Sequence, residues 1–185
     1  MNFLKLSAGL TATLAIVGCS GPAEDAPSSD TAADQPQLIG TGILQLADGA
    51  SAGTIELLRS GSTITAQITA NGLSEGTHGF HLHTTGACEA PDFKSAGGHL
   101  NPGGSTHGKL SEGGSHLGDL PNLEVAADGT ANAAITLDGD ADQILPSIFD
   151  ADGTATVIHA GADDYKSDPA GVAGARVACA IISAS

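Results

Sequence analysis

The sequence predicts an all-β domain, an eight-stranded antiparallel Greek-key β-barrel or sandwich with long loops. Glycine is abundant, at 26 of 185 residues, tryptophan is absent and aromatic residues make up 3%. Such a composition is poor in helix formers and rich in turn formers. Short runs of alternating apolar and polar residues are separated by turn dipeptides such as Asp-Gly and Asn-Gly, which is typical of β-hairpins. Tight hairpins joined by two long connections favour a Greek-key arrangement.

Eight runs are expected to form strands, four before and four after a long loop at residues 84–121. A loop of this length is uncommon in a compact domain unless it is functional or is held by a metal ion or a disulfide. Residues 141–149 are the one segment expected to hold a helical turn. The expected strands span residues 38–47, 53–59, 62–70, 77–83, 122–127, 131–137, 154–159 and 176–183.

The first residues of the chain have the pattern of a targeting segment. Residues 1–5 carry one positive charge, and the apolar run at 6–17 is too short to span a bilayer. The run ends in Ile16-Val17-Gly18-Cys19, which resembles the lipobox of bacterial lipoproteins, whose cysteine is lipidated and becomes the new N-terminus. The alternative is an ordinary secretory signal cleaved nearby, with Cys19 incidental. We expect a lipoprotein-type signal peptide at 1–18, so that the protein is exported to the periplasm or cell envelope.

Residues 19–37 are rich in Pro, Ala, Ser and Asp and lack apolar periodicity. They are expected to form a disordered tether between the lipid on Cys19 and a domain at residues 38–185. The lipid would be the only attachment to a membrane.

The formal net charge of −15, with only six Lys and Arg residues, argues against a nucleic-acid partner. Phosphate binding requires a basic face, which this chain lacks. The sequence leaves both a monomer and a homodimer open.

The histidines are concentrated in one part of the chain. Six of the seven lie between residues 78 and 116, and the seventh, His159, stands alone. Neutral imidazole is the commonest protein ligand for zinc and copper. The clustering therefore predicts one metal site, or two, with the long loops as metal-binding loops.

His81 and His83 are expected to lie on the same face of a strand, because residues i and i+2 of a strand share a face. An isolated pair of this kind is more often two surface histidines on an edge strand. Further along, three histidines and one aspartate make a complete four-coordinate set of the kind found in structural zinc sites. The alternative is a flexible Gly/Ser loop with scattered histidines. The set consists of His99, His107, His116 and Asp119.

Three cysteines in an exported protein leave one over after a disulfide has formed. If Cys19 carries lipid, Cys88 and Cys179 remain to pair in an oxidising compartment. Two reduced, buried thiols are the alternative.

Several segments together resemble the copper/zinc superoxide dismutase family, in its order and at its spacing. They are GFHLH, SAGGHLNP, HLGDLPNL, VIHAG, the aspartate pair at 163–164 and GARVACAII. The resemblance covers about residues 38–182. It implies a Greek-key barrel that uses copper and zinc to convert superoxide to oxygen and hydrogen peroxide.

The resemblance also implies a role for each matching residue. His99 would bridge the two metals and carry a proton to the substrate, and Arg176 would attract the superoxide anion at the mouth of the copper channel. Asp163 would link His81 to His107, His78 would support the site without binding metal, and Cys88 and Cys179 would form the disulfide. The implied copper ligands are His81, His83, His99 and His159, and the implied zinc ligands are His99, His107, His116 and Asp119.

Two other functions are consistent with the same fold. One is a non-catalytic periplasmic copper/zinc-binding module, and the other is a structural sandwich that binds a partner protein. The strong negative charge also opposes long-range attraction of superoxide, so any steering is expected to come from a local positive patch. Lys94, Lys109 and Lys166 are the nearest candidates, beside Arg176, for such a patch.

Overall fold

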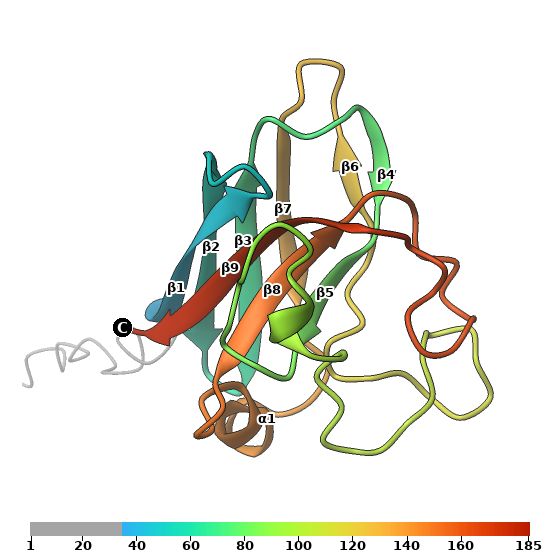
Figure 1. The fold of residues 1–185 in the computed structure, drawn as a ribbon. Helices are drawn as coiled ribbons and strands as arrows, with labels where there is room; N and C mark the ends of the chain where they lie inside the picture. Colours follow the sequence, from blue (N-terminus) through green and yellow to red (C-terminus); the bar gives the residue numbers. More distant parts are fainter. Residues whose placement is uncertain (1–34) are drawn as a thin grey trace, which may run out of the picture.

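The computed structural model describes residues 35–185. The predicted signal peptide (1–18) and Cys19 lie outside the described residues, as does nearly all of the predicted tether (19–37). The all-β prediction is confirmed: most strands form one curled antiparallel sheet, with few helical residues beside it (Figure 1). Seven strands make up this sheet, in the order β5-β8-β9-β1-β2-β3-β7, and β4 and β6 form a separate pair. Non-consecutive neighbours such as β9 and β1 show the crossovers expected of a Greek-key fold.

The strands correspond closely to the expected runs. The hairpins β1–β2 and β2–β3 pair in antiparallel register along almost their whole length. The strands are β1 (Gln37–Leu46), β2 (Ser51–Ser60), β3 (Thr63–Ala70), β4 (Gly76–His78), β5 (Phe80–His83), β6 (Leu123–Val125), β7 (Ala131–Thr136), β8 (Thr154–His159) and β9 (Arg176–Ala184).

One expected strand, 77–83, is divided in two, so the described residues contain nine strand segments rather than eight. The division falls at Gly79, whose N–H donates to Gly161 and whose carbonyl accepts from His159. Before this point β4 pairs with β6, and after it β5 pairs with β8. A Cβ atom at Gly79 would lie 2.7 Å from the Cβ of Ala173, so a residue without a side chain is needed where the chain changes partners.

The main core lies inside the curled sheet. Along β3 the buried residues alternate with exposed or half-buried ones, and Ile64, Ala66 and Ile68 point inward. On the other face of β8, Ala155 and Val157 pack against Phe93 and Ala96 of the long loop. Strand β8 is therefore buried on both faces, which fixes the position of His159 at its end.

Helix α1 (Ala141–Ile148) replaces the single helical turn expected at 141–149. The Asp140 side chain caps its first turn by accepting from the N–H of Asp142. Ala141, Ile144 and Ile148 are buried against the main core. Between residues 35 and 185, no helix is both long enough and apolar enough to cross a membrane.

The long loop after β5 is held to the sheet in two ways. The predicted disulfide between Cys88 and Cys179 is confirmed and joins the loop to β9, which excludes the alternative of two reduced thiols. The loop also hydrogen-bonds along β5, the edge strand of the sheet: Leu82 donates to Gly118 (3.0 Å) and accepts from Leu100 (2.8 Å). Together with the short 3-10 helix η2 (Lys94–Ala96), these contacts bring the loop histidines beside those of β5.

Candidate metal centre

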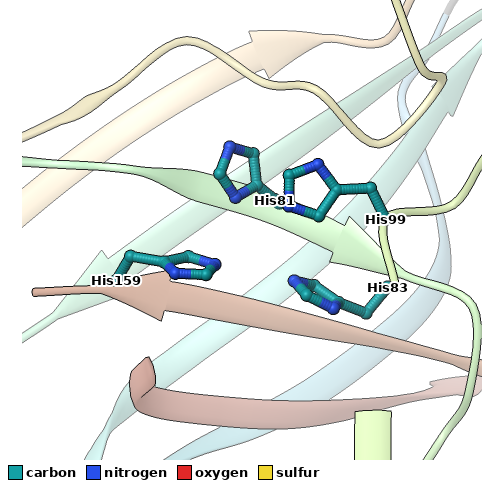
Figure 2. A group of neighbouring side chains, drawn as sticks. All are labelled: His81, His83, His99 and His159. Carbon is teal, nitrogen blue, oxygen red and sulfur yellow. The ribbon is translucent and has the colours of Figure 1, made fainter. Parts of the chain in front are cut away.

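Four histidines meet beside the end of β5. His81 and His83 project from the same face of this strand, while Leu82 between them packs into the main core. His159 comes from the end of the neighbouring β8, and His99 comes from the long loop. The four imidazoles gather around a common centre (Figure 2), and one nitrogen of each lies within 4.8 Å of those of the others. We call this group the four-histidine cluster.

The nitrogens of this cluster divide into paired and unpaired atoms. His83 Nδ1 donates to the Gly97 carbonyl (3.0 Å), His159 Nδ1 donates to the Gly174 carbonyl (3.1 Å), and His81 Nε2 donates to Asp163 (2.8 Å). These bonds leave the opposite nitrogen of each ring as a lone pair. Among residues 35–185, five buried side-chain atoms lack a hydrogen-bond partner, and four of them belong to this cluster. They are His81 Nδ1, His83 Nε2, His99 Nε2 and His159 Nε2, with Thr154 Oγ1 as the fifth.

Burial keeps three of these imidazoles, those of His83, His99 and His159, neutral at neutral pH. It lowers the pKa of His83 to about 2, with further lowering by the neighbouring charges of His99, Arg176 and His159. Burial likewise lowers the pKa of His99 and of His159 to about 4, in both cases reinforced by His81. Neutral rings with converging lone pairs are what a transition metal requires. The donor set therefore fits copper, for which imidazole is a good ligand.

A second group, the three-histidine–aspartate cluster, lies on the far side of His99. The Nδ1 atoms of His99, His107 and His116 lie 2.8, 3.0 and 3.0 Å from the same oxygen, Asp119 Oδ1. The other carboxylate oxygen accepts from the N–H groups of Gly108 (2.7 Å) and His116 (2.9 Å). Three imidazole nitrogens and one carboxylate oxygen are the donors and the number that a structural zinc site uses.

The electrostatics of Asp119 support a bound cation. Burial raises the pKa of its carboxyl, but the hydrogen bonds from His99, Gly108 and His116 outweigh burial and hold the pKa well below its usual range. The carboxyl is therefore ionised at neutral pH. It brings the negative charge that a divalent ion needs in a buried site.

Asp163 joins the two clusters. Its Oδ2 accepts from His81 Nε2 (2.8 Å) and its Oδ1 accepts from His107 Nε2 (2.9 Å). Burial raises the pKa of Asp163, but the bonds from His81, His107 and the Tyr165 N–H hold it well below its usual range. The carboxylate thus fixes which nitrogen of each ring faces the metal position. Gly171 lies directly against it, and a Cβ atom there would overlap Asp163 Oδ1.

His78 lies outside both clusters, as the resemblance implies. Its Nδ1 donates to the carbonyl of His159 (2.6 Å), and its Nε2 lies 2.9 Å from the carbonyl of Ser74. It is 2% exposed. His78 therefore holds the backbone that carries His159.

Arg176 lines a cleft that reaches both clusters. Its guanidinium donates to the carbonyls of Phe93 (2.7 Å) and Gly97 (2.6 Å), which fixes its position. The cleft has a volume of about 380 Å³, and its lining includes His99, His116 and His159. The cleft is thus large enough for a small anion to lie between a fixed positive charge and two rings of the four-histidine cluster, those of His99 and His159.

The lysines expected near this cleft do not line it. Lys94 pairs with Asp92 (2.8 Å), and the ammonium of Lys109 lies 4.1 Å from the centre of the Tyr165 ring. Among the described residues, the charged side chains that line the cleft, apart from its histidines, are Arg176 and Asp168. None of Lys94, Lys109 and Lys166 is among the residues that line the cleft, which carries the Asp168 carboxylate beside Arg176, and a contribution of these lysines to steering stays a prediction.

Sequence reasoning did not find all residues that support the site. The carbonyls of Gly97 and Gly174 orient His83 and His159, but a backbone carbonyl gives no signal in the residue type. Asn122 and Tyr165 contact Asp163 directly. Asn122 belongs to the HLGDLPNL segment already noted. The sequence could therefore indicate that Asn122 lies near the site, but not that its side chain bonds to Asp163.

The comparisons with known proteins agree with the geometry. Residues 51–182 match the model of the copper/zinc superoxide dismutase (SODC) family. The chain is 39% identical over 148 residues to a superoxide dismutase [Cu-Zn] of Caulobacter vibrioides, an alignment that spans 77% of this chain and 84% of the relative. It is 40% identical over 141 residues to superoxide dismutase [Cu-Zn] 2 of Aquifex aeolicus, across 73% and 81% of the two chains.

Two solved structures have a similar fold. The crystal structure of a SOD-like protein from Bacillus subtilis gives a TM-score of 0.69 at 37% identity, over 79% of this chain and 98% of that one. The Cu/Zn superoxide dismutase from Brucella abortus gives a TM-score of 0.62 at 27% identity, over 80% and 100%. With a family model that covers most of the chain and relatives of this similarity, the chain belongs to the copper/zinc superoxide dismutase family.

Proposed function

We propose that the protein is a superoxide dismutase that uses copper in the four-histidine cluster and zinc in the three-histidine–aspartate cluster. The observation that carries the proposal is the double role of His99. Its Nε2 is one of the four converging, unpaired nitrogens, and its Nδ1 faces Asp119 in the other cluster. A ring whose two nitrogens serve two adjacent sites suits a redox metal beside a redox-silent one.

The proposed ligands are the residues expected from the sequence. His81, His83, His99 and His159 would bind copper, and His99, His107, His116 and Asp119 would bind zinc. When bound, copper supplies a one-electron couple, so that one superoxide is oxidised to oxygen and a second is reduced, with two protons, to hydrogen peroxide. Zinc has no redox chemistry and supplies a fixed charge.

The residues of this chain perform the remaining steps. Arg176 binds the anion in the cleft through a guanidinium that stays charged at all relevant pH values. His99 Nε2 would hold a proton and give it to the reduced substrate, because it is the His99 nitrogen that converges with the unpaired nitrogens of the other three rings. Asp163 holds His81 and His107 in the tautomers that leave Nδ1 free for metal.

The test combines metal analysis with an assay of superoxide consumption. The protein should bind about one copper and one zinc per chain and should consume superoxide only when copper is present. His81→Ala should abolish turnover, because one of four copper ligands is lost, and far-UV circular dichroism should still show the folded sheet. Turnover at the wild-type rate in this variant would refute the assignment.

The same experiment addresses the alternative of a non-catalytic copper/zinc-binding module. Such a module would take up both metals but would not consume superoxide. The geometry does not favour it, since Arg176 and all four members of the copper cluster are in place.

We also propose that the domain, residues 38–185, is exported and tethered. The support is the lipobox-like ending at Cys19, the composition of residues 19–37 and a disulfide suited to an oxidising compartment. In a bacterial host, Cys19→Ser should release the protein from the membrane fraction, and mass spectrometry should find lipid on Cys19 of the unaltered chain. Retention of the variant in the membrane would contradict the anchor. Sedimentation equilibrium would decide between monomer and homodimer.

A further inference from the structure

Beyond the residues that touch the metal positions, Asp163 belongs to a closed ring of hydrogen bonds. The Asn122 side chain accepts from the N–H of Asp163 (2.9 Å) and donates to its carbonyl (2.9 Å). The Asn122 N–H donates to the Tyr165 hydroxyl (2.7 Å), and the Tyr165 N–H donates to Asp163 Oδ1 (2.6 Å). Each of the three residues is therefore held by the other two.

The ring fixes the carboxylate in two respects. Asn122 holds the backbone of Asp163 from both sides, so the starting point of its short side chain is defined. The Tyr165 N–H holds Oδ1, the oxygen that also accepts from His107. With these groups in place, Oδ2 is left facing His81.

Tyr165 also connects this ring to the loop that carries His107. Its carbonyl accepts from the N–H of Leu110 (3.0 Å), and the Lys109 ammonium lies over its ring. The backbones approach so closely that a Cβ atom at Gly108 would overlap the Tyr165 carbonyl. Tyr165 holds a left-handed backbone conformation, with φ at 61°, which is strained for a bulky residue and persists only where surrounding contacts determine it.

We propose that Asn122 and Tyr165 are positioning residues that keep the Asp163 carboxylate between His81 and His107 and so retain the zinc ion. They touch neither metal position nor substrate. Their effect passes through Asp163, and the inference therefore rests on the role of Asp163 in the proposed function. Loss of supporting hydrogen bonds of this kind typically lowers metal affinity by about 10- to 100-fold.

Two variants remove different hydrogen bonds among Asn122, Asp163 and Tyr165. Tyr165→Phe removes the hydroxyl that accepts from Asn122 but keeps the aromatic ring under Lys109 and the N–H that bonds Asp163. Asn122→Ala removes both bonds to the Asp163 backbone. The copper- and zinc-loaded proteins would be mixed with a chromophoric zinc chelator, and both variants should release zinc about tenfold faster than the wild type or more.

A second measurement separates positioning from general loss of stability. In the diamagnetic copper(I)- and zinc-loaded protein, NMR should show that the ring N–H protons of His81 and His107 exchange with water faster in Tyr165→Phe. The control Ile68→Val trims the main core, to which neither Asp163 nor Tyr165 belongs, and should lower the melting temperature without changing either readout.

Asp163→Asn distinguishes the two levels of the proposal. If this reference variant releases zinc faster while Tyr165→Phe and Asn122→Ala match the wild type, the positioning role is overturned and the role of Asp163 stands. If Asp163→Asn also matches the wild type, the role of Asp163 in the proposed function fails. Faster release by Ile68→Val to the same extent would likewise overturn the inference, since it would make zinc loss a consequence of stability alone.

Discussion

The imidazole of His99 belongs to both clusters, and the other three rings of the four-histidine cluster are held in fixed orientations around it. Each of the other three rings in the four-histidine cluster has one nitrogen bound to a fixed acceptor. Rotation of a ring would break that bond in a buried place, at a cost of roughly 1–3 kcal/mol. The unpaired nitrogens therefore already point toward the common centre of the cluster in the metal-free protein.

The carboxylate of Asp168 gives a prediction about rate. It lies in the cleft beside Arg176 and repels a superoxide anion, while its Oδ1 accepts from the His107 N–H (2.8 Å). Asp168→Asn keeps an oxygen acceptor and removes the charge. The second-order rate constant at low ionic strength should rise, on the order of twofold, and the gain should disappear at high salt.

The matched control for this change is Asp128→Asn. Asp128 likewise accepts a backbone N–H, from Thr130, but it lies in an exposed turn between β6 and β7. Asp128→Asn removes the same unit of charge from the molecule and should leave the second-order rate constant unchanged. Equal acceleration by both variants would show that only the total charge matters.

Thr154 gives a prediction about stability. Its hydroxyl is fully buried on β8 without a partner among the described residues, and an unsatisfied buried hydroxyl costs roughly 1–3 kcal/mol. Thr154→Val has nearly the same shape and should stabilise the metal-free protein by about 1 kcal/mol, which raises its melting temperature by about 3 °C. A lower melting temperature in calorimetry would show that the hydroxyl bonds a buried water.

At the scale of the elements, the segment from Thr84 to Gly97 connects the disulfide to the active cleft. Cys88 ties it to β9, and its carbonyls at Phe93 and Gly97 hold Arg176. The Gly97 carbonyl also holds His83. The disulfide therefore supports both the guanidinium of Arg176, which would attract the substrate, and one ring of the four-histidine cluster.

Removing the disulfide should affect stability and turnover together. Cys88→Ala combined with Cys179→Ala opens a loop closed across 91 residues and should lower the free energy of unfolding by about 2–5 kcal/mol. Turnover at saturating copper should also fall, because Arg176 loses its fixed acceptors. Denaturant titration and the superoxide assay check the two effects, and full turnover in the double variant would show that the loop keeps its place without the disulfide.

Much of this element-scale arrangement could be predicted from the sequence. The residues of both clusters were identifiable because six of the seven histidines lie in one segment and because several segments resemble one family. The division of the expected strand 77–83 at Gly79 could not be predicted from the sequence. The run of residues is continuous there, and only its pairing partners change. The same holds for the Gly97 carbonyl and for the Asn122–Tyr165 contacts, which depend on segments far apart in the chain.

At the scale of the whole molecule, acidic pH acts on the site and on folding in the same direction. In the folded, metal-free protein the pKa of His83 is about 2 and those of His99 and His159 are about 4, whereas histidines of the unfolded chain titrate near 6.5. Below that value the unfolded chain binds more protons, so stability is full above pH 6.5 and is lost as the pH falls.

The melting temperature of the metal-free protein should therefore be constant above about pH 7 and should fall steadily from about pH 6.5 towards pH 4. Calorimetry across this range measures the slope. His83→Gln removes one of the protons taken up on unfolding and should flatten the slope in proportion. A melting temperature that does not change between pH 7 and 4 would show that the rings take up protons in the folded state as readily as in the unfolded chain.

The edge of the sheet connects metal uptake to the behaviour of the protein in a crowded solution. An open edge strand offers its N–H and C=O groups to any other extended chain, which is a common route to self-association. Here the segment that covers β5 bridges to it at His81–Asp119 and at His83–His99, so the residues that would bind the ions also close the edge. Bound ions would therefore add to the disulfide and the backbone hydrogen bonds that hold this segment on β5, and metal loading would help to keep the edge closed to other chains.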